Sequence, residues 1–215
     1  PSPNRAFDAR SVHFEHASPV SPPVPYAFDM RTKTLTQRQP PSEPPPSTPL
    51  VCERVHAAAR DGEQIPLTLV RGAGVVPSTD TPLLLLAYGA YGACLRAEWR
   101  AEHLPLLERG WVIGLAHVRG GGELGPRWHQ AASRLEKHRS AYDLSDVLSW
   151  LHGRAVSSPG RSTAAADSAG ALAVGGLLNE APEALAAAVL RAGFVDPLGA
   201  MLDETLPLAI EEREE

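Results

Sequence analysis

Three short apolar runs that alternate with helix-like segments constrain the fold of this chain more than any other feature. The runs lie in TPLLLLAYG (81–89), LLERGWVIGLAHV (106–118) and LAAAVLRAGFV (185–195), and each has the length of a buried strand. The spacing of an amphipathic helix, 3, 4, 3, is found at Ala141, Leu144, Leu148 and Leu151. Such alternation predicts an α/β fold with a mostly parallel sheet, in which ligands gather at the carboxyl ends of the strands.

The N-terminal part of the chain has a different character. Two β-like patches, around Val12 to Phe14 and Pro25 to Asp29, flank a proline-rich stretch. The segment PPSEPPPSTP (40–49) has six prolines in ten positions, which predicts an extended connector and a domain boundary. After it, β-branched and leucine residues flank Asp61-Gly62, a dipeptide that favours positive φ, so we expect a β-hairpin there.

The composition excludes several classes of protein. The 215 residues are 43% hydrophobic and carry a formal net charge of −5 with no dense Lys/Arg block, so nucleic acid is not an expected partner. No apolar run approaches the roughly 20 residues of a transmembrane segment. Cys52 and Cys94 alone cannot build a disulfide framework, which fits a cytoplasmic location. The eight histidines show no H-E-x-x-H pattern, and we expect no metal and no cofactor.

The segment ADSAGA (166–171) carries the pattern of a nucleophile turn between a strand and a helix. Such a turn forces its serine, here Ser168, into strained backbone angles, and it requires the small residues that Ala166 and Gly170 supply. The alanine- and leucine-rich segment that follows predicts a helix whose first amides help to hold an oxyanion. A serine that caps a helix explains the same pattern. We expect the neighbouring Asp167 to point outward.

Two further clusters follow the strand-like runs. In YGAYG (88–92), the Tyr88 hydroxyl can donate a hydrogen bond to a tetrahedral intermediate, and a plain glycine turn with surface aromatics is the alternative. In HVRGGGELG (117–125), three consecutive glycines predict a tight loop, and we expect Arg119 and Glu123 to pair and fix it. A phosphate-binding loop is excluded, because the pattern G-x-x-x-x-G-K-[ST] does not occur.

Four segments taken together resemble the prolyl oligopeptidase family of serine hydrolases, in order and in spacing: YGAYG, GWVIGLAHVRGGGELGPRWH, SAGALAVGGLLNEAPEALAAAV and FVDPLGAMLDETLPL. Within the family, the chain is most similar to the prolyl endopeptidase-like branch and next to oligopeptidase B. The resemblance implies that residues 1–39 are the end of a β-propeller domain, a remnant of its last blade, and that 40–49 form a linker. Residues 50–215 are then the N-terminal part of an incomplete α/β-hydrolase domain.

The same resemblance implies the roles of individual residues. Ser168 takes the position of the nucleophile, and the backbone amide of Ala169 with the Tyr88 hydroxyl takes the oxyanion site. Family members place the triad acid and histidine well downstream of the serine, whereas no histidine follows Ser168 here. We therefore expect the triad Asp and His to lie outside this sequence, and we assign neither Asp196 nor Asp203 as the acid.

Two histidines and two departures from the family pattern bear on this assignment. His117 and His129 precede the serine and could act as the base only on an unrelated fold, a reading that we reject. Asp167 places an acid beside the nucleophile, and Ala171 stands where the family usually has a second glycine. These departures favour the alternative that the protein is a non-catalytic relative acting as a binding or adaptor protein.

The function that this reasoning predicts is a serine hydrolase that cleaves short peptides, esters or thioesters through an acyl-enzyme, with a propeller limiting access. Without a base, the chain as given is expected to be inactive or nearly so. The sequence has no initiating Met, so we expect a fragment of a longer protein or a partial gene model, with an exposed sheet edge. The sequence predicts no particular oligomeric state.

Overall fold

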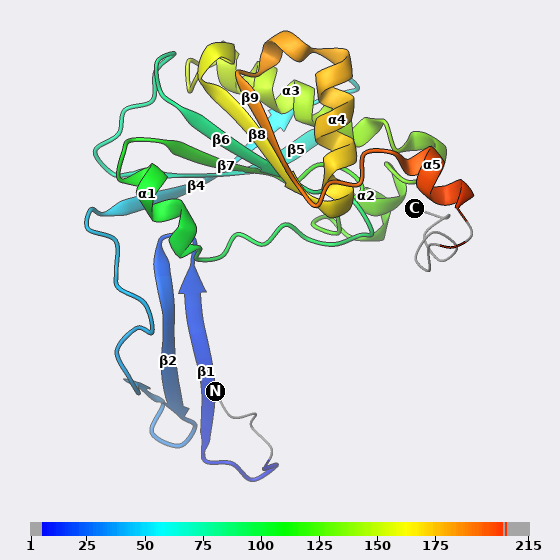
Figure 1. The fold of residues 1–215 in the computed structure, drawn as a ribbon. Coiled ribbons are helices and arrows are strands. Elements are labelled where there is room, and N and C mark those ends of the chain that lie inside the picture. The colour runs from blue at the N-terminus through cyan, green and yellow to red at the C-terminus, as the bar shows by residue number, and fades with distance from the viewer. Residues whose placement is uncertain (1–5, 204, 206–215) are drawn as a thin grey trace.

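The computed structural model describes residues 6–203 and residue 205. These residues form a six-stranded mixed sheet with helices packed on it, and a three-stranded antiparallel sheet that extends from one side of the larger unit (Figure 1). The helices are α1 (Leu104–Leu107), α2 (Pro126–Gln130), α3 (Arg139–Gly153), α4 (Ala171–Glu180) and α5 (Pro197–Leu202). Short 3-10 turns lie at Ala101–His103, Arg134–Glu136, Pro159–Arg161, Ser168–Gly170 and Pro182–Ala184. The predicted fold class, α/β, is confirmed.

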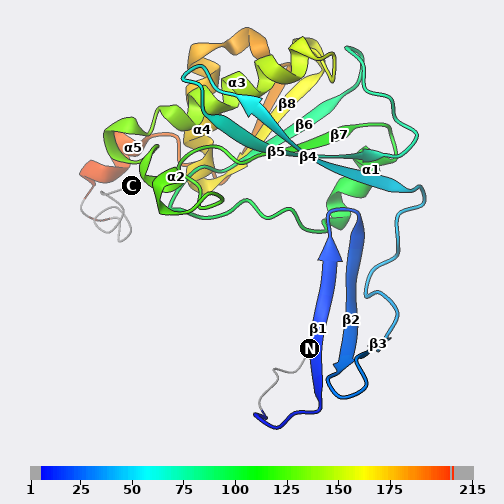
Figure 2. The same ribbon diagram turned by 180° about the vertical axis from the view of Figure 1, so that it is seen from behind.

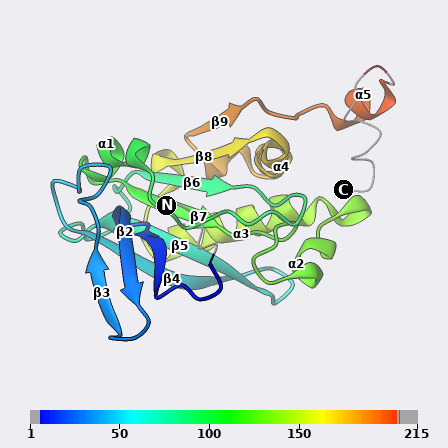
Figure 3. The same ribbon diagram turned by 90° about the horizontal axis from the view of Figure 1, so that it is seen from below.

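The large sheet has the strand order β4-β5-β7-β6-β8-β9, with β4 and β9 at opposite edges (Figure 3). Its strands are β4 (Leu50–Ala58), β5 (Gln64–Gly72), β6 (Leu83–Ala87), β7 (Val112–Ala116), β8 (Ser162–Asp167) and β9 (Ala187–Arg191). The pairs β6–β7, β6–β8 and β8–β9 are parallel, whereas β5 is antiparallel to both β4 and β7. The mostly parallel sheet that the sequence predicts is therefore a parallel group extended by an antiparallel hairpin.

That hairpin, β4–β5, is the one predicted from the Asp61-Gly62 dipeptide. Its register runs without interruption from the pair Leu50↔Gly72 to the pair Ala58↔Gln64. Gly62 has a φ of +91°, and its amide donates to the carbonyl of Ala59 at 2.9 Å. The turn thus needs a residue that tolerates positive φ, as the sequence indicated.

The main hydrophobic core lies between the large sheet and helices α3 and α4, which cover the upper side of the sheet in Figure 1. All four residues of the predicted amphipathic pattern are buried: Leu144, Leu148 and Leu151 belong to this core, and Ala141 lies against Gly176 of α4. The three leucines pack against inward-facing strand residues such as Leu67, Leu83 and Leu85. Burial of this apolar stripe is what fixes α3 on the sheet, because a helix of this length is marginal in water by itself.

The other face of the sheet is covered unevenly. Over β5 and β7, a second cluster that contains Val70, Leu107, Ile113 and Leu115 packs against α1 and against Val20 of the small sheet. Over β6, β8 and β9, alternate side chains such as Leu84 and Ala165 line an open cavity of about 730 Å³. The described part of the chain therefore presents a half-open sheet face beside the carboxyl ends of β6 and β8.

The small sheet has the order β1-β2-β3, with β1 at Ser11–Ser18, β2 at Ser21–Asp29 and β3 at Thr34–Gln37 (Figure 2). Both predicted β-like patches are confirmed, but the prediction that a proline-rich stretch separates them is wrong. The three prolines at 22, 23 and 25 belong to β2 and lie before residues 26–29, which pair with β3; on that side the Pro25 carbonyl only accepts, from the amide of Arg38 at 2.9 Å. A strand with one open edge tolerates residues that lack a backbone N–H.

The predicted connector, residues 40–49, contains no helix or strand. It is tied to the large unit at two points: Trp99 Nε1 donates to Glu43 Oε2 at 2.5 Å, and Ser47 Oγ donates to Glu108 Oε1 at 2.5 Å. The connector is therefore extended but held along its length. That it marks a domain boundary, and that the small sheet is the end of a propeller, both stay predictions.

Candidate active site

Ser168 lies where β8 ends and the turn into α4 begins. Its side chain is exposed, and its φ is +49°, a left-handed conformation that costs a residue other than glycine free energy. Its carbonyl accepts a hydrogen bond from the amide of Phe194, beyond β9, at 3.0 Å. The position that caps the turn is Asp167, which has extended angles, and Gly170 precedes α4. The reading of Ser168 as a helix cap therefore does not fit its backbone.

The residues two places before and after Ser168 are small for a visible reason. Ala166 is buried in the core beneath the turn. A side chain at Gly170 would place its Cβ 3.1 Å from the carbonyl oxygen of Ala87 and 3.1 Å from both Cα and Cδ2 of Tyr88. A side chain at position 170 would therefore require the end of β6 or the Tyr88 ring to shift by a few tenths of an ångström, which glycine avoids.

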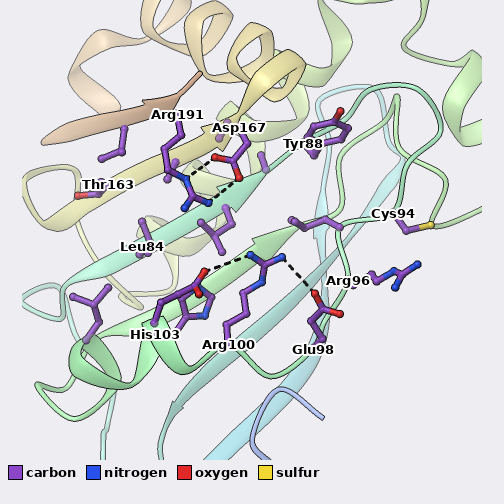
Figure 4. Close-up of a pocket in the computed structure, with 18 of the residues that line it drawn as sticks. Leu84, Tyr88, Cys94, Arg96, Glu98, Arg100, His103, Thr163, Asp167 and Arg191 are labelled. Carbon is purple, nitrogen blue, oxygen red and sulfur yellow. Dashed lines mark hydrogen bonds and ion pairs between the residues drawn. The ribbon is translucent and has the colours of Figure 1, made fainter. Parts of the chain in front are cut away.

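Tyr88 is the first residue after β6, at the same end of the sheet as the serine turn. Because β6 and β8 are parallel neighbours with Leu86 opposite Ala165, the end of β6 reaches the level of the end of β8. The Tyr88 ring packs on the backbone of Gly170. Figure 4 shows Tyr88 near Asp167 at this edge of the sheet. The parallel pairing thus brings together two motifs that are far apart in the sequence.

The carboxylate of Asp167 is 51% exposed and, with Tyr88 and Arg191, lines the open cavity over β6, β8 and β9. It accepts two hydrogen bonds from Arg191, its register partner on β9: Nε to Oδ1 at 2.6 Å and Nη2 to Oδ2 at 2.8 Å (Figure 4). A bidentate guanidinium balances the carboxylate charge locally. The acid beside the serine therefore does not place an unpaired negative charge at the turn.

The expected pair of Arg119 and Glu123 is not formed, and that prediction is wrong. Arg119, which is only 3% exposed, directs its guanidinium to Asp143 on α3, with Nη2 to Oδ1 at 2.5 Å, and to Asp61 in the hairpin turn, also at 2.5 Å. The Arg119 amide donates to Asp143 as well, at 2.9 Å. This pairing raises the pKa of Arg119 and lowers the pKa of the Asp61 carboxyl. Sequence proximity suggested a local partner, but the fold supplies distant ones.

A signal for this buried pair was present in the sequence. Asp143 stands between Ala141 and Leu144, on the core-facing side of the predicted helix, and an acid there requires a buried partner. Glu123 instead accepts hydrogen bonds from the amide of Leu95 at 2.8 Å and from Nδ1 of His117 at 3.3 Å. The three-glycine loop is therefore held by two separate sets of contacts.

The other residues that the sequence analysis considered for catalysis are His117, His129, Asp196 and Asp203, and each makes contacts within the fold. His117 is buried, and its Nε2 lies 2.9 Å from the hydroxyl of Thr68. His129 packs near Gly92 from α2. Asp196 caps α5 by accepting from the amide of Gly199 at 2.9 Å, and Asp203 accepts from the amide of Thr205 at 2.9 Å.

Within residues 6–203 and 205, no three side chains of His, Cys, Asp or Glu are grouped as ligands for a metal ion. None of the helices described is both long enough and apolar enough to cross a bilayer.

Comparison with known proteins identifies the family. The sequence profile of the prolyl oligopeptidase family matches residues 98–215. Prolyl endopeptidase-like of Homo sapiens is 36% identical over 208 residues, which is 97% of this chain and 28% of that protein. Dipeptidyl aminopeptidase BI of Pseudoxanthomonas mexicana is also 36% identical over 208 residues, covering 95% of this chain and 28% of that protein. Oligopeptidase B from Trypanosoma brucei, solved with covalently bound antipain, matches with a TM-score of 0.87 at 30% identity, over 98% of this chain and 30% of that one.

The sheet, its covering helices and the serine turn at a strand end are those of the α/β-hydrolase class. The chain belongs to the prolyl oligopeptidase family. It spans about 28% of the length of the curated relatives named above. The family resemblance read from the four sequence segments is thereby confirmed.

Proposed function

We propose that this chain carries the nucleophile and the oxyanion site of a serine hydrolase of the prolyl oligopeptidase type. The observation that supports the proposal most strongly is the conformation of Ser168, an exposed serine with a φ of +49° at the carboxyl end of a central parallel strand. A strained residue persists only where the surrounding structure enforces it, and such residues gather at active sites. The packing of Tyr88 on Gly170 adds the second group that the chemistry needs.

In the proposed reaction, the Ser168 hydroxyl attacks the carbonyl carbon of an acyl substrate while a histidine takes its proton. The Tyr88 hydroxyl and the amide of Ala169 donate hydrogen bonds to the oxygen that becomes negatively charged. The histidine then protonates the leaving group, and an acyl-enzyme on Ser168 forms. Water, activated by the same histidine, attacks the acyl-enzyme and releases the acid.

We further propose that the histidine and the triad acid are not among these 215 residues. All eight histidines precede Ser168 in the sequence. His117 is engaged with Thr68 and Glu123, and His152 is bound to Ser162, at the opposite end of β8 from the serine turn. Without a base the serine hydroxyl stays protonated, so these residues alone are expected to be inactive or nearly so.

The proposed substrates are short peptides, with esters and thioesters as the other acyl class. Matched relatives named as peptidases, dipeptidyl aminopeptidase BI and oligopeptidase B, favour the peptide class. The two departures that favoured a binding or adaptor protein are accommodated locally: Asp167 is paired with Arg191, and Ala171 is fully buried in α4. These observations favour the hydrolase over the adaptor.

Labelling by a fluorophosphonate probe tests the proposal. The polypeptide that carries this chain with its native C-terminal residues should label at Ser168, and Ser168→Ala should abolish the signal. Ser149→Ala, at an exposed position on α3, is the matched control and should label as the wild type does. Equal labelling of the wild type and Ser168→Ala would refute the nucleophile assignment and leave the binding protein as the better description.

A further inference from the structure

A series of polar side chains crosses the large sheet towards the segment that carries Tyr88. It begins with Arg54 on β4 and Thr68 on β5, continues with His117 after β7 and Glu123 in the glycine loop, and ends at the amide of Leu95. The strands involved are consecutive in the sheet, β4-β5-β7-β6, and Leu95 lies on the segment that follows β6. The contacts therefore connect the outer hairpin with the end of β6.

The donors and acceptors in this series follow from the chemistry of its first member. Arg54 Nη1 lies 3.4 Å from His117 Nε2, and the Thr68 hydroxyl lies 2.9 Å from the same nitrogen. A guanidinium can only donate, so Nε2 is the acceptor and the ring proton lies on Nδ1. Nδ1 then donates to Glu123 Oε1 at 3.3 Å, and the same oxygen accepts from the Leu95 amide at 2.8 Å.

Glu123 is a buried carboxylate whose hydrogen bonds are incomplete. Its side chain is only 8% exposed, and its second oxygen, Oε2, has no hydrogen-bond partner among the described residues. Burial of a carboxylate with one unsatisfied oxygen is unfavourable, so a fold retains it only where other contacts hold it in place. His117 and Leu95 are those contacts.

The segment held by Glu123, residues 88–95, has no helix or strand of its own. Further anchors include the carbonyl of Gly89, which accepts from Ser140 Oγ at 3.2 Å and from Lys137 Nζ at 3.1 Å, and the amide of Gly92, which donates to the carbonyl of Gly120 at 3.0 Å. Tyr91 within it has a φ of +57°, so the segment is not in a relaxed conformation. Its shape therefore depends on anchors from the start of α3 and from the glycine loop.

We propose that Glu123 is a positioning residue that fixes the 88–95 segment through the Leu95 amide and thereby orients the Tyr88 hydroxyl towards the acyl oxygen at Ser168. Arg54, Thr68 and His117 hold the Glu123 carboxylate in the required orientation. The part that concerns Tyr88 rests on the proposed function, whereas the anchoring of Leu95 does not.

Hydrogen exchange tests the anchoring. In the full polypeptide, Glu123→Ala should accelerate exchange of the Leu95 amide by about tenfold or more, because the amide loses its only recorded acceptor. Glu123→Gln should restore slow exchange, because its side-chain oxygen can still accept from Leu95. Unchanged exchange in Glu123→Ala would overturn the proposal. Should Glu123→Ala fail to fold by circular dichroism, Glu123→Asp, whose carboxylate is one methylene further from Leu95, takes its place and should also exchange faster.

A double-mutant cycle with the fluorophosphonate probe tests the orientation of Tyr88. Glu123→Ala and Tyr88→Phe should each slow labelling of Ser168 by roughly 10- to 100-fold, and the double variant should be no slower than the slower single variant. Multiplied losses in the double variant would show that Glu123 acts independently of Tyr88, which would overturn the proposal. If the wild type and Ser168→Ala label equally, the proposed function fails, and hydrogen exchange still decides whether Glu123 anchors the segment.

Discussion

The ends of β7 and β8 lie at the same edge of one sheet but are stabilised in opposite ways. The segment after β7 is fixed by buried charges, since Arg119 is 3% exposed and its partner Asp143 is 0% exposed. The turn after β8 is exposed and strained at Ser168, and the ion pair beside it, Arg191 with Asp167, is 65% and 51% exposed. The difference teaches that one sheet can hold a segment in place by buried charges and, on the other side of β6, tolerate an exposed and strained turn, which is where we propose the nucleophile lies.

The largest effect is expected from a variant that breaks the buried ion pair of Arg119 and Asp143 at the end of β7. Asp143→Ala leaves the Arg119 guanidinium buried without its bidentate partner, so the free energy of unfolding should fall by about 3–5 kcal/mol. Urea denaturation measures the change. Asp146→Ala is a matched control on the same helix, because its partner Arg60 is 40% exposed and its loss should cost much less. Equal losses for the two variants would mean that burial does not distinguish these pairs.

An intermediate effect concerns the strain at the end of β8. Ser168→Gly should be more stable than Ser168→Ala by about 1 kcal/mol, because glycine tolerates the left-handed conformation that alanine does not. Both variants lack the hydroxyl, so thermal or urea unfolding compares their backbones alone. In a relaxed helical turn the order would be reversed, since glycine there is less favourable than alanine by about 0.5–1 kcal/mol.

The smallest effect is a dependence on pH at the end of β7. Arg119 lowers the pKa of Asp61 below its unfolded value of about 3.9. The contact therefore stabilises the fold above that value and is lost as the pH falls through the lower, folded pKa. Asp61 is 43% exposed, so the contribution should be below about 1 kcal/mol.

Urea unfolding at pH 7 and near pH 3 measures this contribution. Asp61→Asn should remove it, so that the variant loses less stability than the wild type between the two pH values. Arg191→Ala, which breaks the exposed pair at the end of β8, is the control and should change stability at pH 7 by less than about 0.5 kcal/mol. A pH response of Asp61→Asn identical to that of the wild type would contradict the expectation.

Local patterns predicted the elements that local forces determine. The Asp61-Gly62 hairpin, the strand-like runs and the four buried positions of α3 follow from turn chemistry and periodicity. The prolines of β2 were misread because their tolerance depends on which neighbouring strand lies beside them, and that is a property of the sheet. The partner of Arg119 was also missed, because Asp143 lies on α3, 24 residues away in the sequence, and approaches Arg119 only in the folded chain.

In the candidate site too, the features that are local in the sequence could be predicted, whereas the contacts between distant segments could not. The small residues around Ser168 are adjacent in the sequence, so a strained strand-to-helix turn could be predicted there. The approach of Tyr88 to Gly170 depends on β6 and β8 being parallel neighbours, which no local pattern specifies. The family resemblance implied only that Tyr88 and the Ala169 amide share one site, and it specified no strand pairing. The hydrogen bond from Leu95 to Glu123 was not anticipated, because it joins two segments without regular structure.

The hydrogen bond from the Phe194 amide to the Ser168 carbonyl connects the strained backbone of Ser168 to the segment that follows β9. Among the described strands, β9 pairs only with β8, as β4 at the other edge of the sheet pairs only with β5; such a strand detaches more easily than one that is paired on both sides. Each time β9 detaches, Ser168 loses that bond and its backbone is free to relax to an ordinary conformation. The left-handed conformation of Ser168 is therefore coupled to the attachment of β9, and a variant that holds β9 to β8 more firmly should favour that conformation without changing the serine.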